Sequence, residues 1–69
     1  MLSKEVILCL LKENFIILSE YYDRIYLQKN NLNLKVKINN NSIVLHYNGN
    51  HKVIQNINQL EEILNGIKN

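Results

Sequence analysis

Two histidines are the side chains of this sequence whose spacing comes closest to a ligand site. His46 and His51 flank the dipeptide Asn48-Gly49, which strongly favours a two-residue hairpin turn between β-rich runs. The two imidazoles should therefore face each other across the hairpin, where they could share a metal ion. A structural zinc site usually has three or four protein ligands, and the sequence supplies no third ligand near this pair. We expect no metal and no cofactor, and we interpret both rings as solvated side chains.

The other reactive side chains form no pattern that is typical of an enzyme. Cys9 lies within an apolar run, where a cysteine is usually buried and inert. Gly49 and Gly66 are isolated, so the sequence has no glycine-rich phosphate loop. The six acids all fall in segments that we predict to be helical, on faces suited to solvent: Glu5, Glu13, Glu20, Asp23, Glu61 and Glu62. We therefore predict that the protein is not an enzyme.

Residues 24–60 contain no acidic side chain. The strands predicted within this span carry cationic groups that could attract phosphates by counterion release. This basic surface would consist of Lys35, Lys37, His46, His51 and Lys52. Proteins that bind single strands also need aromatic rings for stacking, and only Tyr47 lies in the predicted strands. A nucleic-acid-binding regulator that uses the basic sheet face is therefore our alternative function.

Three of the four tyrosines lie close together in the sequence. Tyr21, Tyr22, Ile25 and Tyr26 would form part of a wide apolar stripe if their segment is helical. Tyrosine is enriched at protein–protein interfaces, because it combines an apolar body with a polar tip. Such a stripe would be wider than one small sheet can cover, so part of it should contact a protein partner. This partner could be a second copy of the chain, in a homodimer formed through this region. Our leading function is a small non-catalytic protein-interaction module.

The composition bears on the origin and the compartment of the protein. The 69 residues include thirteen Asn, ten Ile and seven Lys, but no Ala, Thr, Pro or Trp, which indicates an AT-rich genome. Phages and mobile elements of such hosts carry many short chains. The concrete form of the leading function is thus an inhibitor or modulator of a larger host protein, for example a defence-system antagonist. A single cysteine argues against a disulfide scaffold, and no apolar run reaches the ~20 residues of a membrane span. We expect a cytoplasmic protein without membrane contact.

The chain length predicts one small domain over residues 1–69. Residues 3–29 contain neither Gly nor Pro, and from Ile17 onward apolar doublets recur about every four residues, which favours a helix. One continuous helix would be long for this domain, so a break near Glu13-Asn14 is an alternative. The β-branched and aromatic residues of segment 15–28 favour a hairpin instead, but we expect helix there.

Three strands are predicted next, over residues 32–39, 43–47 and 51–56. In the first strand Leu32, Leu34, Val36 and Ile38 alternate with Asn33, Lys35 and Lys37. Side chains of a strand point alternately to its two faces, so one face of this strand should be buried and the other basic. An Asn-rich turn over residues 39–42 and the Asn48-Gly49 turn connect the three strands.

A C-terminal helix follows, with Asn58 and Glu61 as a capping pair and Gly66 at its end. The predicted fold class is α+β in the order α-β-β-β-α, with the long N-terminal helical region and the short C-terminal helix packed on one face of a three-stranded antiparallel sheet. This order resembles the double-stranded-RNA-binding domain in topology. That family contacts phosphates with a basic start of its last helix, whereas residues 58–62 contain two acids, so we assign no family membership.

Overall fold

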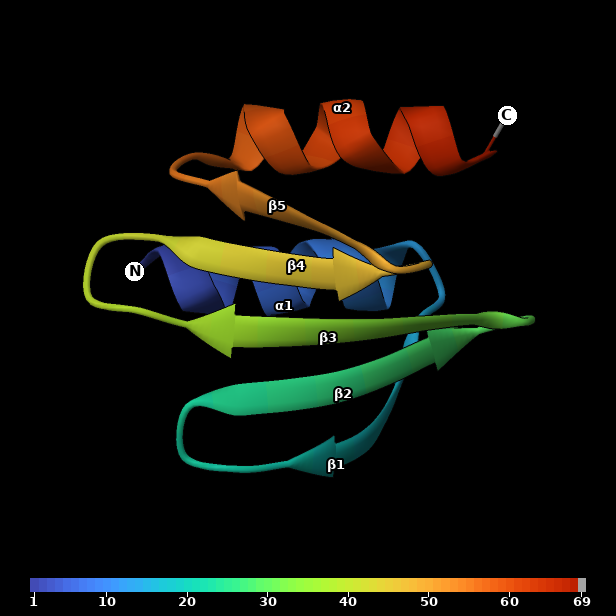
Figure 1. The fold of residues 1–69 in the computed structure, drawn as a ribbon, viewed down its shortest axis with the longest axis horizontal. Coiled ribbons are helices and arrows are strands. Elements are labelled where there is room, and N and C mark those ends of the chain that lie inside the picture. The colour runs from blue at the N-terminus through green and yellow to red at the C-terminus, as the bar shows by residue number, and fades with distance from the viewer. Residues whose placement is uncertain (69) are drawn as a thin grey trace.

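The computed structural model describes residues 1–68, which form two helices and one antiparallel sheet (Figure 1). The elements are α1 (Leu2–Lys12), β1 (Ile16–Glu20), β2 (Arg24–Lys29), β3 (Leu32–Ile38), β4 (Ile43–Tyr47), β5 (Asn50–Ile54) and α2 (Ile57–Lys68). Each strand pairs with the next one along the chain, so the five strands form a meander. The fold class is α+β. The predicted three-stranded sheet is wrong, because β1 and β2 add two strands where we expected helix.

α1 ends where an asparagine adopts a left-handed backbone conformation. Asn14 has a φ of 71°. Its backbone N–H donates to the carbonyl of Leu11, and the backbone N–H of Phe15 donates to the carbonyl of Leu10, both at 3.0 Å. These two bonds form the motif that commonly closes a helix before a left-handed residue. Because Phe15 and Leu10 are both buried, this motif also fixes the direction in which the chain enters β1.

Segment 15–28 forms a β-hairpin and not the predicted helix. The helix-like spacing of its apolar residues has a local cause. The pairing of β1 with β2 shifts between Ile17 and Ser19, so Leu18 is an extra residue in a β-bulge. The bulge interrupts the two-residue alternation, and the two tyrosines of the following turn continue the interruption. Apolar residues consequently recur at a spacing that imitates a helix, whereas the β-branched and aromatic residues of the segment favour the strands that form.

The predicted hairpin at Asn48-Gly49 is confirmed. β4 and β5 pair across this two-residue loop, which places His46 opposite His51. Asn48 has a φ of 49° and Gly49 has a φ of 76°, as a type I′ turn requires. The left-handed conformation carries no steric cost at a glycine. The strand predicted over residues 51–56 begins one residue earlier than expected and ends at Ile54.

α2 begins two residues earlier than the predicted capping pair. The backbone N–H of Gln59 donates to Oδ1 of Asn56 at 3.1 Å, which makes Asn56 the N-cap in place of Asn58. The side-chain Oε1 of Gln59 in turn accepts the backbone N–H of Gln55 at 2.6 Å, an arrangement close to a capping box. The helix does not end at Gly66, because this residue keeps a helical backbone.

Both helices pack on the same face of the sheet and close one apolar core. α1 lies behind the middle strands in the view of Figure 1, and α2 lies beside β5 and contacts both β5 and α1. The buried side chains are Val6, Leu10, Phe15, Leu27, Leu34, Val36, Ile43, Leu45, Ile54, Leu60 and Leu64. No polar side chain of the described residues is buried, so apolar packing alone forms this core. Neither helix within residues 1–68 has the length and apolar character that a membrane crossing requires.

Candidate binding face

The sheet has an inner face, which the two helices cover, and an opposite outer face (Figure 1). In β3, Leu34 and Val36 are buried against the core, whereas Lys35 is half-buried and Lys37 is exposed. Residues directly opposite each other in neighbouring strands share a face. The outer face across β2 to β5 therefore comprises Arg24, Tyr26, Gln28, Asn33, Lys35, Lys37, Val44, His46, His51 and Val53.

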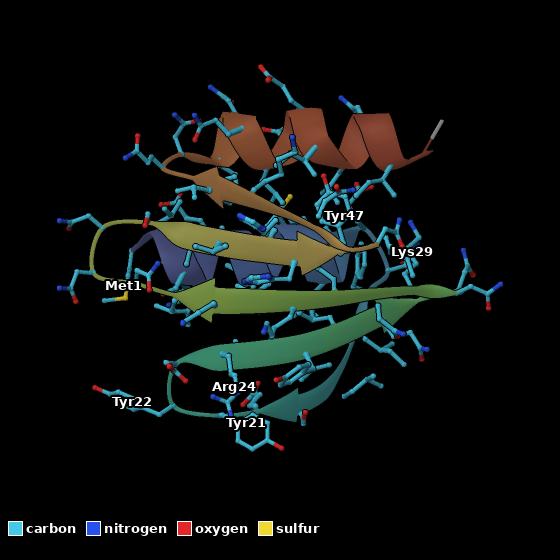
Figure 2. The ribbon with its side chains drawn as sticks, viewed as in Figure 1. Met1, Tyr21, Tyr22, Arg24, Lys29 and Tyr47 are labelled. Atoms are coloured by element: carbon cyan, nitrogen blue, oxygen red, sulfur yellow. The ribbon has the colours of Figure 1, made fainter. Side chains whose placement is uncertain are left out.

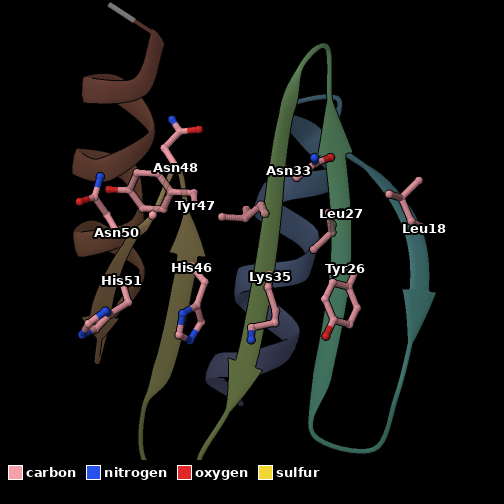
Figure 3. Close-up of a pocket in the computed structure, with 12 residues that line it drawn as sticks. Leu18, Tyr26, Leu27, Asn33, Lys35, His46, Tyr47, Asn48, Asn50 and His51 are labelled. Atoms are coloured by element: carbon pink, nitrogen blue, oxygen red, sulfur yellow. The ribbon is translucent and has the colours of Figure 1, made fainter.

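One row of the outer face combines an aromatic ring with three nitrogen-bearing side chains. Tyr26, Lys35, His46 and His51 are successive pairing partners on β2, β3, β4 and β5. Figure 3 shows them side by side, at the edge of an open hollow of about 580 Å³. Because neighbouring strands lie about 4.8 Å apart, the row is about 14 Å long. A ligand in the hollow can contact all four side chains at once.

A second group of contacts lies at the β1–β2 end of the outer face. The guanidinium carbon of Arg24 lies 4.8 Å from the centre of the Tyr21 ring, a cation–π distance. The Tyr21 ring also meets the Tyr26 ring edge-on, with 5.8 Å between the ring centres. Figure 2 shows Tyr21 and Arg24 together beside the turn. These contacts orient the Tyr21 ring, of which 55% remains exposed.

The charge of the outer face is positive. Arg24, Lys35 and Lys37 all belong to it, and no acid occurs in the paired residues of β2 to β5. The nearest opposing charge is Asp23, whose Oδ1 lies 3.6 Å from Nη1 of Arg24. Both side chains of this ion pair are exposed, so the pair contributes little to stability and solvent screens it. Among residues 1–68, no acidic side chain forms an ion pair with either lysine, and an anionic ligand would be attracted to them.

The protonation of His46 reflects the positive charge around it. Its pKa is lowered from the usual 6.5, first by loss of solvent around the ring and then by repulsion from Lys35, His51 and Lys37. His46 is therefore neutral at pH 7. An anion bound beside these groups would offset the repulsion and raise the pKa of His46 again.

The residues of the predicted tyrosine surface do not lie together. Tyr21 and Tyr26 contact each other, but Tyr22 points away from the sheet at the turn and is fully exposed (Figure 2). Ile25 lies opposite Val36 and packs against the core on the inner face. The helix that would have aligned these four residues does not form. Only the two contacting rings therefore remain available to one binding surface.

Four of the five residues of the predicted basic surface do share a face. Lys35, Lys37, His46 and His51 all belong to the outer face. Lys52 lies opposite the buried Leu45, which places it on the side of the sheet that α2 occupies. There it borders a separate hollow, together with residues of α2.

The sequence prediction missed Arg24 and Tyr26 as members of the basic sheet face. Both residues enter this face because β2 pairs with β3 across the two-residue loop Asn30-Asn31, in which Asn30 has a φ of 54°. Asparagine tolerates this left-handed conformation, and residues that favour strands lie on both sides of the dipeptide. The Asn30-Asn31 dipeptide between these two segments is the signal that could have identified the hairpin.

Within residues 1–68, no group of three or more His, Cys, Asp or Glu side chains is placed to hold a metal ion. The outer face thus has the features of a binding surface, namely exposed rings, cations and a shallow hollow. No protein-family model, curated protein or solved structure matches this chain, so its function has to be inferred from the outer face itself.

Proposed function

We propose that this protein is a non-catalytic binding module that holds single-stranded nucleic acid against the outer face of its sheet. The observation that carries the proposal is the row in which the Tyr26 ring stands beside Lys35, on a face without acids. The sequence prediction favoured a protein partner because it assigned three tyrosines to a wide helical stripe and found only Tyr47 in the predicted strands. With β1 and β2 formed, Tyr26 and the adjoining Tyr21 supply such rings.

The two kinds of side chain would contact different parts of the ligand. Aromatic rings stack on unpaired bases, and this stacking tolerates any base because every base has a π-face. Arg24, Lys35 and Lys37 would neutralise phosphates on either side of the stacked bases and release their counterions. His46 would add a hydrogen-bond donor at neutral pH and a charge at lower pH.

A single strand fits this face better than a duplex does. Stacking on Tyr26 requires a base that is not already stacked and paired within a helix. Neither helix can enter a groove of a duplex bound to the outer face, since α1 and α2 lie on the opposite face. Binding with little sequence preference is expected, because the face offers more charges and rings than side chains for reading base edges.

The experiment is a fluorescence-anisotropy titration of short single-stranded DNA, single-stranded RNA and duplex DNA with the purified protein. We expect the single strands to bind more tightly. Between about 50 and 200 mM salt, the log–log slope for a single strand should be near −2, as three neutralised phosphates predict. Lys35→Glu with Lys37→Glu should abolish binding. Lys4→Glu with Lys12→Glu is the matched control, because it changes the net charge equally and both lysines are exposed on α1 at the other side of the sheet.

Absence of saturable binding to all three probes would refute this function. So would equal loss of binding in the control with Lys4→Glu and Lys12→Glu, which would indicate only the effect of net charge. Preference for the duplex would exclude stacking on Tyr26 as the mode of contact.

A protein partner is the second candidate, and a different region favours it. Apolar side chains are exposed around β1 and its turn: Ile16, Leu18, Tyr21 and Tyr22. Tyr22 is fully exposed at the turn, and an exposed tyrosine of this kind suits an interface. A homodimer, or an inhibitor of a larger host protein in the cytoplasm, would use this end of the sheet. Sedimentation at micromolar concentration tests the homodimer, and Tyr22→Ala should dissociate it.

A further inference from the structure

The β4–β5 end of the outer face holds two imidazole rings side by side, away from the tyrosine cluster. His46 and His51 are direct partners across the hairpin, and their ring centres are 5.8 Å apart, with 35° between the ring planes. Figure 3 shows both rings directed to the same side of the strands. Two imidazoles bound to one ion through bonds of about 2.1 Å have ring centres roughly 4.5–6 Å apart. The observed separation lies within this range, and rotation about the side-chain bonds can turn one nitrogen of each ring toward a shared ion.

The surroundings of the pair restrict which ion could bind. Mg²⁺ and Ca²⁺ need several oxygen ligands, and the sheet offers no carboxylate here. Imidazole nitrogens suit Cu²⁺, Ni²⁺ and Zn²⁺. An imidazole ring has to be unprotonated to bind a metal ion. Lys35 and Lys37 oppose a cation by repulsion, so the affinity must come from the nitrogen–metal bonds.

We propose that His46 and His51 together chelate one Cu²⁺, Ni²⁺ or Zn²⁺ ion beside the turn of the β4–β5 hairpin, with water completing its coordination. The sequence prediction of no metal rested on the number of ligands that a closed structural site requires. A two-histidine site is an open one, in which further positions remain accessible. The inference does not rest on the proposed function, because it concerns the two rings alone.

The test is an NMR titration of the protein with ZnCl₂, without nucleic acid. The ring signals of His46 and His51 should shift together and saturate, whereas MgCl₂ should leave them unchanged. His51→Ala should weaken Zn²⁺ binding at least about tenfold, because the second ring binds intramolecularly at high effective concentration. Lys35→Gln should strengthen it about two- to threefold, because one screened repulsion is removed.

The pH dependence of Zn²⁺ binding is a second measurement, which needs only the wild-type protein. Lowering the pH to about 5 should release the ion from the wild-type protein, because protonated imidazole no longer ligates a metal. Zn²⁺ should also raise the Tm of the wild type, since it binds the folded hairpin, and should leave the Tm of His51→Ala unchanged. The proposal is overturned if Zn²⁺ fails to shift both rings by about 1 mM, or if His51→Ala binds Zn²⁺ as tightly as the wild type.

Discussion

The two faces of the sheet are built from alternate residues of the same strands, yet they have different properties. The inner face is apolar, buried and covered by both helices. The outer face carries three cations, two histidines and a tyrosine, and none of its side chains belongs to the buried core. The comparison indicates that stability resides in one set of alternate positions, while the other set is available for binding. Substitutions at two adjacent residues of one strand should therefore affect different properties, one the stability of the fold and the other the binding of a ligand.

The largest difference is expected between Val36 and Lys35, which are adjacent in β3. Val36→Asp places an unpaired charge in the core, and we expect it to cost about 4 kcal/mol or more, comparable with the total stability of a chain of this size. Lys35→Glu should leave the free energy of unfolding within about 0.5 kcal/mol, as surface changes usually do. Urea denaturation followed by circular dichroism measures both. Similar destabilisation by the two changes would contradict the division between the faces.

The next effect concerns binding rather than folding. Tyr26→Ala should weaken single-strand binding by about 1–3 kcal/mol, the usual range for one stacked base. Tyr22→Ala is the matched control, because Tyr22 is fully exposed and points away from the sheet. Anisotropy titrations of both variants provide the measurement. If the Tyr22 variant loses more affinity than the Tyr26 variant, the binding surface lies at the turn instead of the outer face.

Substitutions at the two glycines should change the stability by a smaller amount, and they test the turn that joins β4 to β5. Gly49→Val should cost about 1–3 kcal/mol, because Gly49 has a φ of 76° and a β-branched residue is strained there. Gly66→Ala should instead stabilise by about 0.5–1 kcal/mol, since Gly66 is helical and an added Cβ would meet nothing within 4 Å. Thermal unfolding of the two variants measures the contrast. Stabilisation by Gly49→Val would be incompatible with the type I′ turn between His46 and His51.

The smallest effect is the pH dependence that His46 introduces. Because its pKa is lowered in the folded protein, the unfolded chain binds the proton more readily. The contribution of His46 to stability is therefore complete above pH 6.5 and decreases as the pH falls below that value. NMR titration should give His46 a pKa below 6.5, and Lys35→Gln should raise it. A His46 pKa above 6.5 in the unliganded protein would show that the outer face is not a region of positive potential.

The C-terminal part of the fold was predictable because its signals are local. Asn48-Gly49 specifies a type I′ turn by its backbone preferences, and the strict alternation in β3 specifies which side chains are buried. The positions of Lys35, Lys37, His46 and His51 on one face followed from these two patterns. Lys52 was misplaced, because the sequence prediction did not carry the hairpin register through to the partner of Leu45.

The N-terminal part was not predictable from periodicity, because two interruptions disguise the strands. The bulge at Leu18 and the turn that contains Tyr22 both add residues that have no pairing partner. These residues break the alternation of apolar and polar positions. A sequence pattern records spacing alone, and a strand with an insertion can have the spacing of a helix. Tyr26 was therefore assigned to a helix, and the aromatic component of the outer face was missed. The Asn30-Asn31 turn and the β-branched and aromatic residues of segment 15–28 were the local signals that contradicted that assignment.

The meander order of the strands also has a kinetic consequence. Every strand pairs with its predecessor, so each hairpin closes a loop of only two to four residues and no pairing waits for a distant segment. Chains with such low contact order usually fold rapidly. The contact between α1 and α2 is the exception, since it joins opposite ends of the chain. We expect the sheet to assemble progressively from its hairpins as the chain leaves the ribosome, and docking of the two helices on each other to be the last step.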